Sequence, residues 1–554
     1  MYSSEKRPWM IPPEPVPEDQ IKETFESEFV IIGAGYAGTF CSRKLMESGA
    51  KVTLLEKCVR EKMRPNILGG SEVAVFNSKY GFSRGIPEYD PIDYILEFQK
   101  RSANRCNTDL VRLIANNSGE WFDWFIEPLP QEIKDHITIF NFPGSDLFRG
   151  DTNGYKSFVG TMFFDKPPAC GDQWKSPWNL MAAMIWTLNM VEAKGVNLRY
   201  GTSGEYLEKN KEGRITGVIA KTGDGTYYRY NASKGIVLSC GDFGGNKEMV
   251  FDLLTEFSDL SHRGTKYRLI SQSPRDGKGI RMGLWAGGCL EPGPRGGMYN
   301  SVTGMASPMF FTPFLRLNSK GKRYCNEGLV GMMAGIRGTR QPDGDISAVW
   351  DSNWKEDLRY QGYDHGTSYY FTNPTPVEQA MTLAVKENEQ RKANRAKGIT
   401  STAPTENVSG PPFAKSYLYA ADTFADLADL LGYTETPKEN FVKAINRYNE
   451  LCRKGRDEDF AKDPQYMHEL KNPPYFATKS AKGVGSVMVT EAGLMVDEHQ
   501  QVLDDTGDPI SGLFATGQCA GEVFPLQYSP PISGSGIGTC SPLGYALGKY
   551  LSTL

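Results

Sequence analysis

Few residues in this sequence are arranged to bind a metal ion or a metal cluster. Its ten cysteines are scattered without a C-x-x-C or C-x-x-C-H spacing, and its five histidines include no H-E-x-x-H motif. These absences argue against an iron–sulfur cluster, a covalently attached haem or a zinc site in the chain. Lone cysteines of this kind are usually reduced packing residues. We therefore expect no metal site, and a bound organic cofactor as the source of any redox chemistry.

The chain also lacks a charge excess, a long apolar run and a basic-then-apolar start. The net charge of −4 gives no reason to expect nucleic acid or an acidic membrane surface as a partner. No apolar run reaches the roughly 18 residues that a membrane-spanning helix needs. Residues 1–20 are polar and rich in proline and do not have the build of a signal peptide. We therefore expect a cytoplasmic protein without a membrane span.

A complete dinucleotide-binding pattern is present near the amino end. Residues 28–32 form a short apolar segment typical of a buried strand, and Gly33, Gly35 and Gly38 follow it at G-x-G-x-x-G spacing. The first glycine allows a tight turn, the second lets a pyrophosphate approach the backbone, and the third packs the helix on the strand. Glu56 ends a second predicted strand, where it can accept hydrogen bonds from ribose hydroxyls. The pattern predicts a nucleotide site.

Two later segments have the same character. Residues 235–240 predict a buried strand that ends in Gly241, and residues 512–515 predict another that leads into Gly517. A glycine-rich tail at 533–538 then begins a helix. Because parallel strands with glycine at their carboxyl ends meet at one edge of a sheet, we expect the carboxyl terminus to return to the nucleotide-binding domain.

The length of 554 residues is too great for one ordinary domain. The stretch between the later strands has turn-rich aromatic segments and two amphipathic helices, which indicates a separate unit. We predict an α/β fold with a Rossmann-type nucleotide-binding domain and an inserted α+β domain. The predicted parts are an amino-terminal arm (1–24), the first part of the nucleotide-binding domain (25–304), the insert (305–475) and the carboxyl-terminal part of the nucleotide-binding domain (476–554).

An ordered set of motifs runs from residue 28 to the end of the chain. The motifs are EFVIIGAGYAG, VTLLEK, GIVLSCGDFGGN, SPRDGKGI, LNSKGKRYCNE, NPPYFA, GLMVD and GLFATGQCAGEVF. As a set they resemble the soluble fumarate reductases and 3-ketosteroid dehydrogenases. The resemblance implies FAD rather than NAD, a Rossmann-type FAD-binding domain, and a capping domain formed by the insert. It also implies an FAD-dependent oxidoreductase that transfers hydride between flavin N5 and a carbon of a C–C or C=C bond.

The resemblance implies a set of cofactor-binding residues at strand ends and helix starts. They are Gly33, Gly35, Gly38, Glu56, Gly70, Ser71, Gly241, Gly517, Glu522, Gly536, Ile537 and Gly538. In the family, amides at the start of the last helix stabilise negative charge at flavin N1 and O2. No family-type histidine stands beside Gly70, so we expect FAD to be bound non-covalently.

Three arginine or histidine positions of the fumarate reductases are absent from this sequence. Residues 328–332 (GLVGM) stand where the family has its arginine acid, and Pro531 and Ile532 stand where it has a substrate-clamping arginine. Residues 489–493 (VTEAG) replace its H-T-M-G-G histidine segment. Because a dicarboxylate needs paired cations to offset its desolvation, the sequence argues against fumarate or succinate as substrate.

The tail is similar to that of the ketosteroid dehydrogenases, where a tyrosine hydroxyl and a glycine amide bind the substrate ketone. Tyr528 and Gly534 are the matching candidates, although their spacing differs from the family's. Polarising a carbonyl in this way stabilises an enolate. Tyr299 and His365 are further candidates for substrate contact or proton transfer. The alternatives are that Tyr528 only lines the pocket and that His365 is a surface histidine.

Three functional hypotheses remain open at this point. The first is a reductase or dehydrogenase of a bulky, largely uncharged cyclic compound such as a steroid, isoflavonoid or polyphenol, with reduced flavin, NAD(P)H or a redox protein as external electron partner. The second is a reductase of an acidic α,β-unsaturated compound like fumarate or urocanate, whose anion is held by Arg295, Arg337 or Arg340. The third is a non-catalytic electron-transfer flavoprotein subunit.

Overall fold

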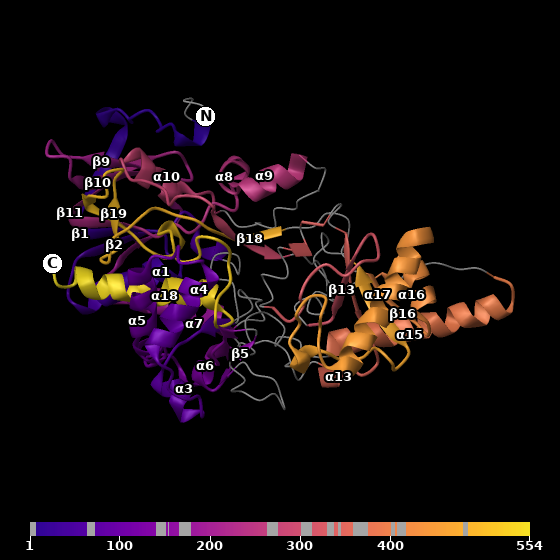
Figure 1. The fold of residues 1–554 in the computed structure, drawn as a ribbon. Helices are drawn as coiled ribbons and strands as arrows, with labels where there is room; N and C mark the ends of the chain where they lie inside the picture. Colours follow the sequence, from indigo (N-terminus) through magenta and orange to yellow (C-terminus); the bar gives the residue numbers. More distant parts are fainter. Residues whose placement is uncertain are drawn as a thin grey trace.

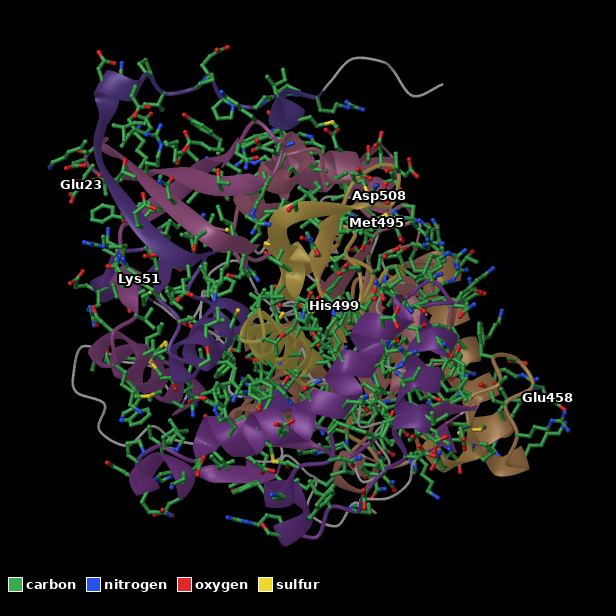
Figure 2. All side chains as sticks on the ribbon, turned by 90° about the vertical axis from the view of Figure 1, so that its left-hand side faces the viewer. Glu23, Lys51, Glu458, Met495, His499 and Asp508 are labelled. Carbon is green, nitrogen blue, oxygen red and sulfur yellow. The ribbon has the colours of Figure 1, made fainter. Side chains whose placement is uncertain are left out.

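The computed structural model describes most of the chain. The described residues are 7–63, 72–139, 151–152, 154–164, 179–262, 275–300, 313–329, 337–338, 340–341, 345–357, 375–399, 405–406, 417–479 and 486–554. Two groups of elements, each built on its own sheet, lie on opposite sides of Figure 1. Charged side chains such as Lys51, Glu458 and Asp508 project from the periphery in Figure 2.

The larger group is built on an eight-stranded sheet. Its strands are β1 (Ile21–Ile32), β2 (Val52–Leu55), β8 (Asn197–Arg199), β9 (Thr202–Lys209), β10 (Ile215–Thr222), β11 (Tyr227–Leu238), β19 (Gln501–Leu503) and β20 (Pro509–Ala515). The order along the main path is β19-β20-β11-β1-β2-β8, and β8, β2, β1, β11 and β20 are parallel. The predicted α/β fold is therefore confirmed. The three strands that end in glycine are neighbours, as expected.

Helices cover the parallel strands because those strands are apolar on both faces. α1 (Tyr36–Glu47) packs against α18 (Ser535–Leu551), and α5 (Thr108–Ile126) packs against α18 in turn. A Cβ atom on Gly544 would overlap the carbonyl oxygen of Ala37, so glycine lets the two helices approach closely. This contact joins the carboxyl-terminal helix to the first helix of the nucleotide-binding pattern.

The remaining elements of this group are short or lie at its margin. The helices are α3 (Lys79–Ser83), α4 (Pro91–Arg101), α6 (Gln131–Lys134), α7 (Asn179–Ala193), α8 (Lys247–Leu253), α9 (Thr255–His262) and α10 (Lys278–Trp285). The small sheets are β3 (Glu72–Ala74), β7 (Thr161–Phe164) and β4 (Ile137–Ile139); β5 (Asp151–Thr152) and β6 (Tyr155–Lys156); and β12 (Gly296–Asn300) and β18 (Ser486–Glu491). Among the helices of the described chain, none is both long and apolar enough to cross a membrane.

The second group is built on a five-stranded antiparallel sheet. Its strands, in order, are β13 (Leu315–Asn318), β14 (Ile346–Trp350), β17 (Tyr475–Lys479), β16 (Tyr417–Ala421) and β15 (Thr405–Glu406). Its helices are α13 (Trp354–Asp357), α15 (Thr375–Ala396), α16 (Phe424–Leu430) and α17 (Glu435–Lys454). Side chains that alternate along β14 and β16 enter two separate cores, one on each face. The division of the chain into domains stays a prediction, and the sheet itself continues past residue 475 to the end of β17.

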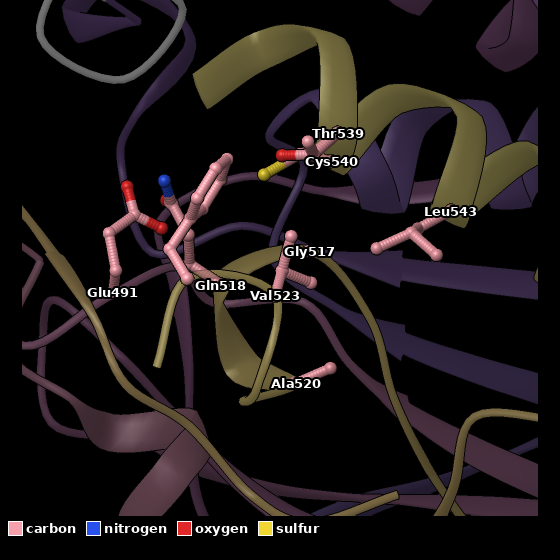
Figure 3. Close-up of a pocket in the computed structure, with 9 residues that line it drawn as sticks. Glu491, Gly517, Gln518, Ala520, Val523, Thr539, Cys540 and Leu543 are labelled. Atoms are coloured by element: carbon pink, nitrogen blue, oxygen red, sulfur yellow. The ribbon is translucent and has the colours of Figure 1, made fainter. Parts of the chain in front are cut away.

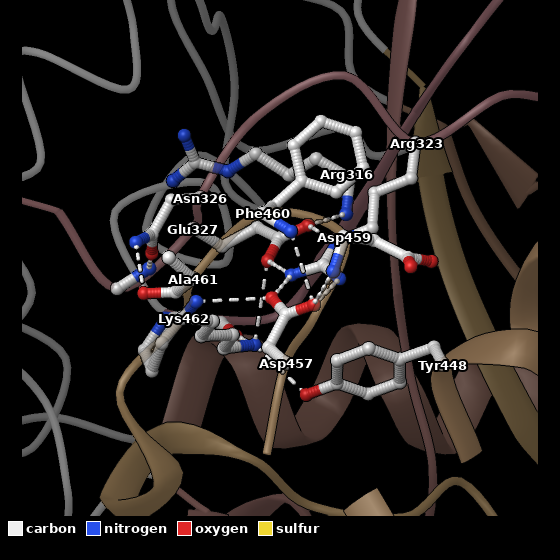
Figure 4. Close-up of polar contacts among 12 residues, drawn as sticks. Arg316, Arg323, Asn326, Glu327, Tyr448, Asp457, Asp459, Phe460, Ala461 and Lys462 are labelled. Carbon is white, nitrogen blue, oxygen red and sulfur yellow. Dashed lines mark hydrogen bonds and ion pairs between the residues drawn. The ribbon is translucent and has the colours of Figure 1, made fainter. Parts of the chain in front are cut away.

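A buried network of charges holds this second group together (Figure 4). Arg323 donates to both oxygens of Asp457 at 3.0 and 2.7 Å and to both oxygens of Glu327 at 2.9 and 2.8 Å. Lys462, which is fully buried, donates to the Tyr448 hydroxyl at 2.8 Å. Burial alone would raise the pKa of Glu327, but Arg323 and Lys462 outweigh it and leave that pKa below its ordinary value. The network ties the turn after β13 to the segment that follows α17.

Replacing Arg323 should strongly destabilise this group of elements. Arg323→Leu removes the cation that binds both buried carboxylates and leaves only Lys462 beside Glu327, and we expect a loss of about 3–5 kcal/mol in the free energy of unfolding at neutral pH. Arg447→Leu removes an arginine whose side chain is 47% exposed in its pair with Asp459, and should cost much less. Chemical denaturation of the three proteins measures both values.

The loss of stability in Arg323→Leu should also depend on pH. Arg323 holds the pKa of Glu327 and Asp457 below the ordinary range, so the stabilisation is present above that range and is lost as the pH falls through the lowered values. Equal losses for Arg323→Leu and Arg447→Leu at neutral pH would contradict a structural role for the network.

Candidate active site

The three glycines of the nucleotide-binding turn differ in their surroundings. Gly33 has a φ of +107°, and a Cβ atom there would overlap the Ser239 carbonyl oxygen at the end of β11. A Cβ atom on Gly38 would overlap the Gly33 carbonyl oxygen, so this glycine lets α1 pack on the turn. A Cβ atom on Gly35 would have no neighbour within 4 Å. The first and third glycines therefore serve packing, and the second faces open space at the start of α1.

Glu56 is held rigidly beside this turn. Its Oε2 accepts the Ala34 N–H at 2.9 Å, and its Oε1 accepts the Cys58 N–H at 2.8 Å. The side chain is buried at the end of β2, which pairs with β1. Each carboxylate oxygen can accept more than one hydrogen bond, so the residue can also bind ribose hydroxyls. Gly35 and Glu56 together fit the pyrophosphate and ribose of a dinucleotide.

Predicted cofactor residues from two other segments lie at the same edge of the sheet. Gly241 follows β11 with a φ of +80°, and Gly517 follows β20 with a φ of +60°. The Cys519 thiol lies 3.4 Å from the Gly241 carbonyl oxygen, which joins the two strand ends. Glu522 also has a positive φ, +64°, and its N–H donates to the buried Glu291 carboxyl. Burial raises the pKa of Glu522.

The start of α18 is packed against β3 through two glycines. Gly534 has a φ of +83°, and its carbonyl oxygen accepts the Ala74 N–H at 3.1 Å. A Cβ atom on Gly538 would overlap the Ala74 carbonyl oxygen. Ile537 is half-buried beside them. These contacts bring β3, which follows the predicted cofactor-binding residues Gly70 and Ser71, to the start of α18.

Tyr528 contacts the same helix start. Its hydroxyl oxygen accepts the Gly536 N–H at 2.8 Å, and the side chain is only 1% exposed. Burial and then the nearby Glu491 raise the pKa of Tyr528 well above its ordinary value, although the Gly536 amide opposes them. The ring of Phe524 packs on the tyrosine ring, with centroids 4.9 Å apart. The Tyr528 hydroxyl thus contacts Gly536, which is two positions after Gly534 in the chain. The sequence did not indicate this hydrogen bond.

A pocket lies between the Gly517 turn and α18 (Figure 3). Gly517, Gln518 and Phe524 line it on one side, and Thr539 and Cys540 line it from α18. Glu491, at the end of β18, supplies the one carboxyl of its described lining, which has no arginine, lysine or histidine. Gly517 is one of the predicted cofactor-binding residues, so the pocket lies at the predicted cofactor site.

Glu491 was not predicted as a functional residue. It is 8% exposed, and its Oε1 has no hydrogen-bond partner among the described residues. Burial and then the Asp242 carboxylate raise its pKa well above the ordinary value, although Arg275 opposes them. The available signal was an acidic residue at the end of an apolar strand pattern, in the segment where the fumarate reductases have their histidine motif.

Several predicted residues have no described side chain. Tyr299 lies in β12, where its backbone is paired with that of Val487, but its side chain is not described. Gly70, Ser71 and His365 lie outside the described residues. Their predicted roles stay predictions.

The arginines proposed to hold an acidic substrate have contacts elsewhere. Arg295 donates to the Glu291 carbonyl oxygen at 3.0 Å. Arg340 pairs with Glu256 at 2.7 Å, and Arg337 is exposed. None of the three is among the described lining residues of the pocket.

A family model described as FAD binding domain matches residues 28–529. The chain therefore belongs to this FAD-binding family. The open space at Gly35 and the position of Glu56 fit the cofactor that the family binds, and FAD is the cofactor of this protein.

Proteins of known name are similar to most of the chain at low identity. A vinyl phenol reductase of Lactiplantibacillus plantarum is 23% identical over 533 residues, which is 94% of this chain and 96% of the relative. A 3-oxosteroid 1-dehydrogenase of Mycobacterium tuberculosis is 23% identical over 58% of this chain and 53% of its own length. A probable fumarate reductase of Shewanella frigidimarina is 21% identical over 90% of this chain and 70% of its own length.

Solved structures share the fold. The 3-ketosteroid-Δ4-(5α)-dehydrogenase of Rhodococcus jostii, in complex with 4-androstene-3,17-dione, has a TM-score of 0.66 at 18% identity, with 96% of this chain and 99% of that chain covered. The open conformation of a flavocytochrome c3 fumarate reductase has a TM-score of 0.60 at 18% identity, with 99% and 82% covered. The protein is an FAD-dependent oxidoreductase of the fumarate reductase and ketosteroid dehydrogenase type, as its motifs predicted.

Two glycine substitutions should separate cofactor binding from folding. Gly35→Ala places a methyl group in the open space at the start of α1, so we expect at least a tenfold weaker affinity for FAD. The same change should cost the apoprotein less than about 1 kcal/mol, the usual scale for an N-cap exchange. Gly38→Ala forces an overlap with the turn and should destabilise the apoprotein by about 1–3 kcal/mol.

Flavin fluorescence titration and denaturation of the apoproteins measure the two effects. Unchanged FAD affinity of Gly35→Ala would show that the pyrophosphate does not pass this glycine.

Proposed function

We propose that this protein is a reductase of a C=C bond that is conjugated with a ring ketone or a phenol in a bulky, largely uncharged compound. Steroids, isoflavonoids and polyphenols are the substrate types that we have in mind. The observation that carries the proposal is the described pocket lining, which has one carboxyl group and no cationic side chain. A dicarboxylate would bring two negative charges beside Glu491 without an arginine to offset their desolvation.

The names of the relatives support a cyclic substrate. The vinyl phenol reductase, which covers nearly the whole chain, is named for a C=C bond attached to a phenol ring. The 3-oxosteroid 1-dehydrogenase is named for a ring ketone. Both names describe uncharged rings that carry an oxygen in conjugation with the reacting bond.

Tyr528 is the residue that we expect to bind the oxygen of such a ring. Its hydroxyl oxygen accepts the Gly536 N–H, and this bond polarises the tyrosine O–H so that it becomes a stronger donor. A hydrogen bond to the ketone oxygen of a substrate would stabilise the negative charge that develops there when hydride adds to the conjugated carbon. Bound FAD supplies the hydride chemistry.

The proposal includes an external electron donor. Reduced flavin, NAD(P)H or a redox protein would reduce the bound FAD. We still expect FAD to be bound non-covalently.

The acidic-substrate alternative has less support, because Arg295 and Arg340 make other contacts and Arg337 is exposed. The non-catalytic alternative is set aside, since the chain is an oxidoreductase.

The direct test is to reduce the FAD-loaded protein anaerobically by light and then offer single acceptors. We expect rapid recovery of oxidised-flavin absorbance with an α,β-unsaturated ketosteroid or a vinyl phenol, and none with fumarate. Reoxidation by fumarate alone would contradict the proposal. If only the oxidised enzyme reacts, and with a saturated ring ketone, the protein is a dehydrogenase of the same substrate class.

Tyr528→Phe should slow this reoxidation without loss of the cofactor. Removing one donor to a developing oxyanion typically costs about 100- to 1,000-fold in rate, and we expect a loss in that range. Tyr545→Phe is the matched control, because that hydroxyl, on α18, donates to Glu120 of α5 at 2.8 Å and makes no contact with Gly536. Stopped-flow absorbance gives both rates. Equal rates for Tyr528→Phe and wild type would contradict this role of Tyr528.

A further inference from the structure

Glu491 is a buried acid aimed into the pocket of a redox enzyme. It comes from β18, which is paired with β12, and Figure 3 shows its carboxyl directed toward Gln518 and, beyond it, Cys540. The side chain is 8% exposed, and its Oε1 has no hydrogen-bond partner within the described part of the chain. Buried polar atoms almost always have a partner, so an orphaned carboxyl oxygen in a pocket calls for an explanation. A substrate group that binds this oxygen, or a proton that it carries, would explain it.

The backbone on both sides of Glu491 is firmly held. The Thr490 N–H and hydroxyl lie 2.7 and 3.2 Å from the same oxygen of Asp242, and the Thr490 hydroxyl accepts the Phe243 N–H at 3.1 Å. Asp242 is in turn paired with Arg275 at 3.0 Å. After Glu491, Leu494 donates to the Cys519 carbonyl oxygen at 2.8 Å. The carboxyl is therefore presented from a rigid support, as a group that takes part in chemistry needs to be.

The charges around Glu491 favour its protonated form. The titratable and charged groups that act on it or are acted on by it belong to Asp242, Arg275, Glu291, Tyr528 and Cys540. Burial, Asp242 and Glu291 raise the pKa of Glu491, and Arg275 is the one cation among them that lowers it. Their balance favours the neutral carboxylic acid, which has a proton to donate.

Glu491 and Tyr528 can divide the work of a reduction between them. Glu491 is close enough to raise the pKa of Tyr528, and both groups lie near the start of α18. Tyr528 is a hydrogen-bond donor for a substrate oxygen, whereas a neutral carboxyl has a proton acidic enough to give to carbon.

We propose that Glu491 is the general acid that protonates the substrate carbon next to the one that receives hydride. The inference rests on the proposed function. When hydride is added to the β-carbon of an alkene that is conjugated with a ring ketone, the π bond breaks and its electron pair moves to the α-carbon and the ketone oxygen. The Glu491 O–H bond then breaks, its proton forms the new α-carbon C–H bond, and its electron pair stays on the carboxylate. Water returns a proton to Glu491, so the sum is one hydride and one proton added to the alkene.

The test compares Glu491→Gln, Glu491→Asp and the control Glu120→Gln as FAD-loaded proteins. Glu120 accepts bonds from Tyr545 and Lys549 on the far part of α18, so its exchange makes the same carboxyl-to-amide change outside the pocket lining. For Glu491→Gln we expect normal FAD loading and photoreduction, and reoxidation by the uncharged alkene slowed about 100-fold or more, the usual scale of general acid catalysis. Glu491→Asp should recover part of the rate, and Glu120→Gln should match wild type.

Two readouts distinguish an acid from a merely structural residue. The wild-type reoxidation rate should fall as the pH rises through the raised pKa of Glu491, and Glu491→Gln should lose this dependence. Infrared difference spectra without substrate, at neutral pH, should show the C=O band of a protonated carboxyl in wild type that is absent from Glu491→Gln.

The outcomes separate this inference from the proposed function. A wild-type protein that no cyclic alkene reoxidises overturns the proposed function and the acid role with it. A responsive wild type with an unchanged rate or an unchanged pH profile in Glu491→Gln overturns the acid role alone. Absence of the protonated-carboxyl band also overturns it, whatever the rates.

Discussion

β11 lies between β1 and β20, and the site is built on this parallel pairing. Leu238 is in register with Ile32 on one side and with Ala515 on the other, so three segments far apart in sequence end at one edge of the sheet. The turns that follow carry Gly33, Gly241 and Gly517, and each has a positive φ that a side chain would oppose. Because parallel strands present their carboxyl ends together, the edge becomes the binding site for the dinucleotide.

The charged residues packed around Glu491 determine the electrostatic character of the pocket. Asp242 holds Thr490, and Thr490 holds the chain that presents Glu491. Carboxyl groups outnumber the one cation around Glu491, so the pocket favours neutral acids over bound anions. The described lining supplies no cationic side chain to pair with a bound dicarboxylate.

The second group of elements is stabilised in a different way. Its sheet is covered on both faces, and its internal charges are neutralised by Arg323 and Lys462. Such a network is costly to break because each partner is already removed from water. It therefore favours a single arrangement of the segments around β13 and α17.

Local patterns in the sequence were sufficient to predict a nucleotide site and the class of fold, and the resemblance of the whole set of motifs supplied FAD as the cofactor. Glycine spacing, apolar strands and the acidic Glu56 act through neighbours in the chain, and the Gly33, Gly35 and Gly38 roles followed from backbone geometry. Glu491 could not be recognised in that way, because its burial, its unpartnered oxygen and its raised pKa come from Asp242, Glu291 and the α18 face. The Tyr528–Gly536 bond likewise joins residues whose contact depends on how the tail folds back. Packing between distant segments decides which buried groups share a space, and no local spacing encodes it.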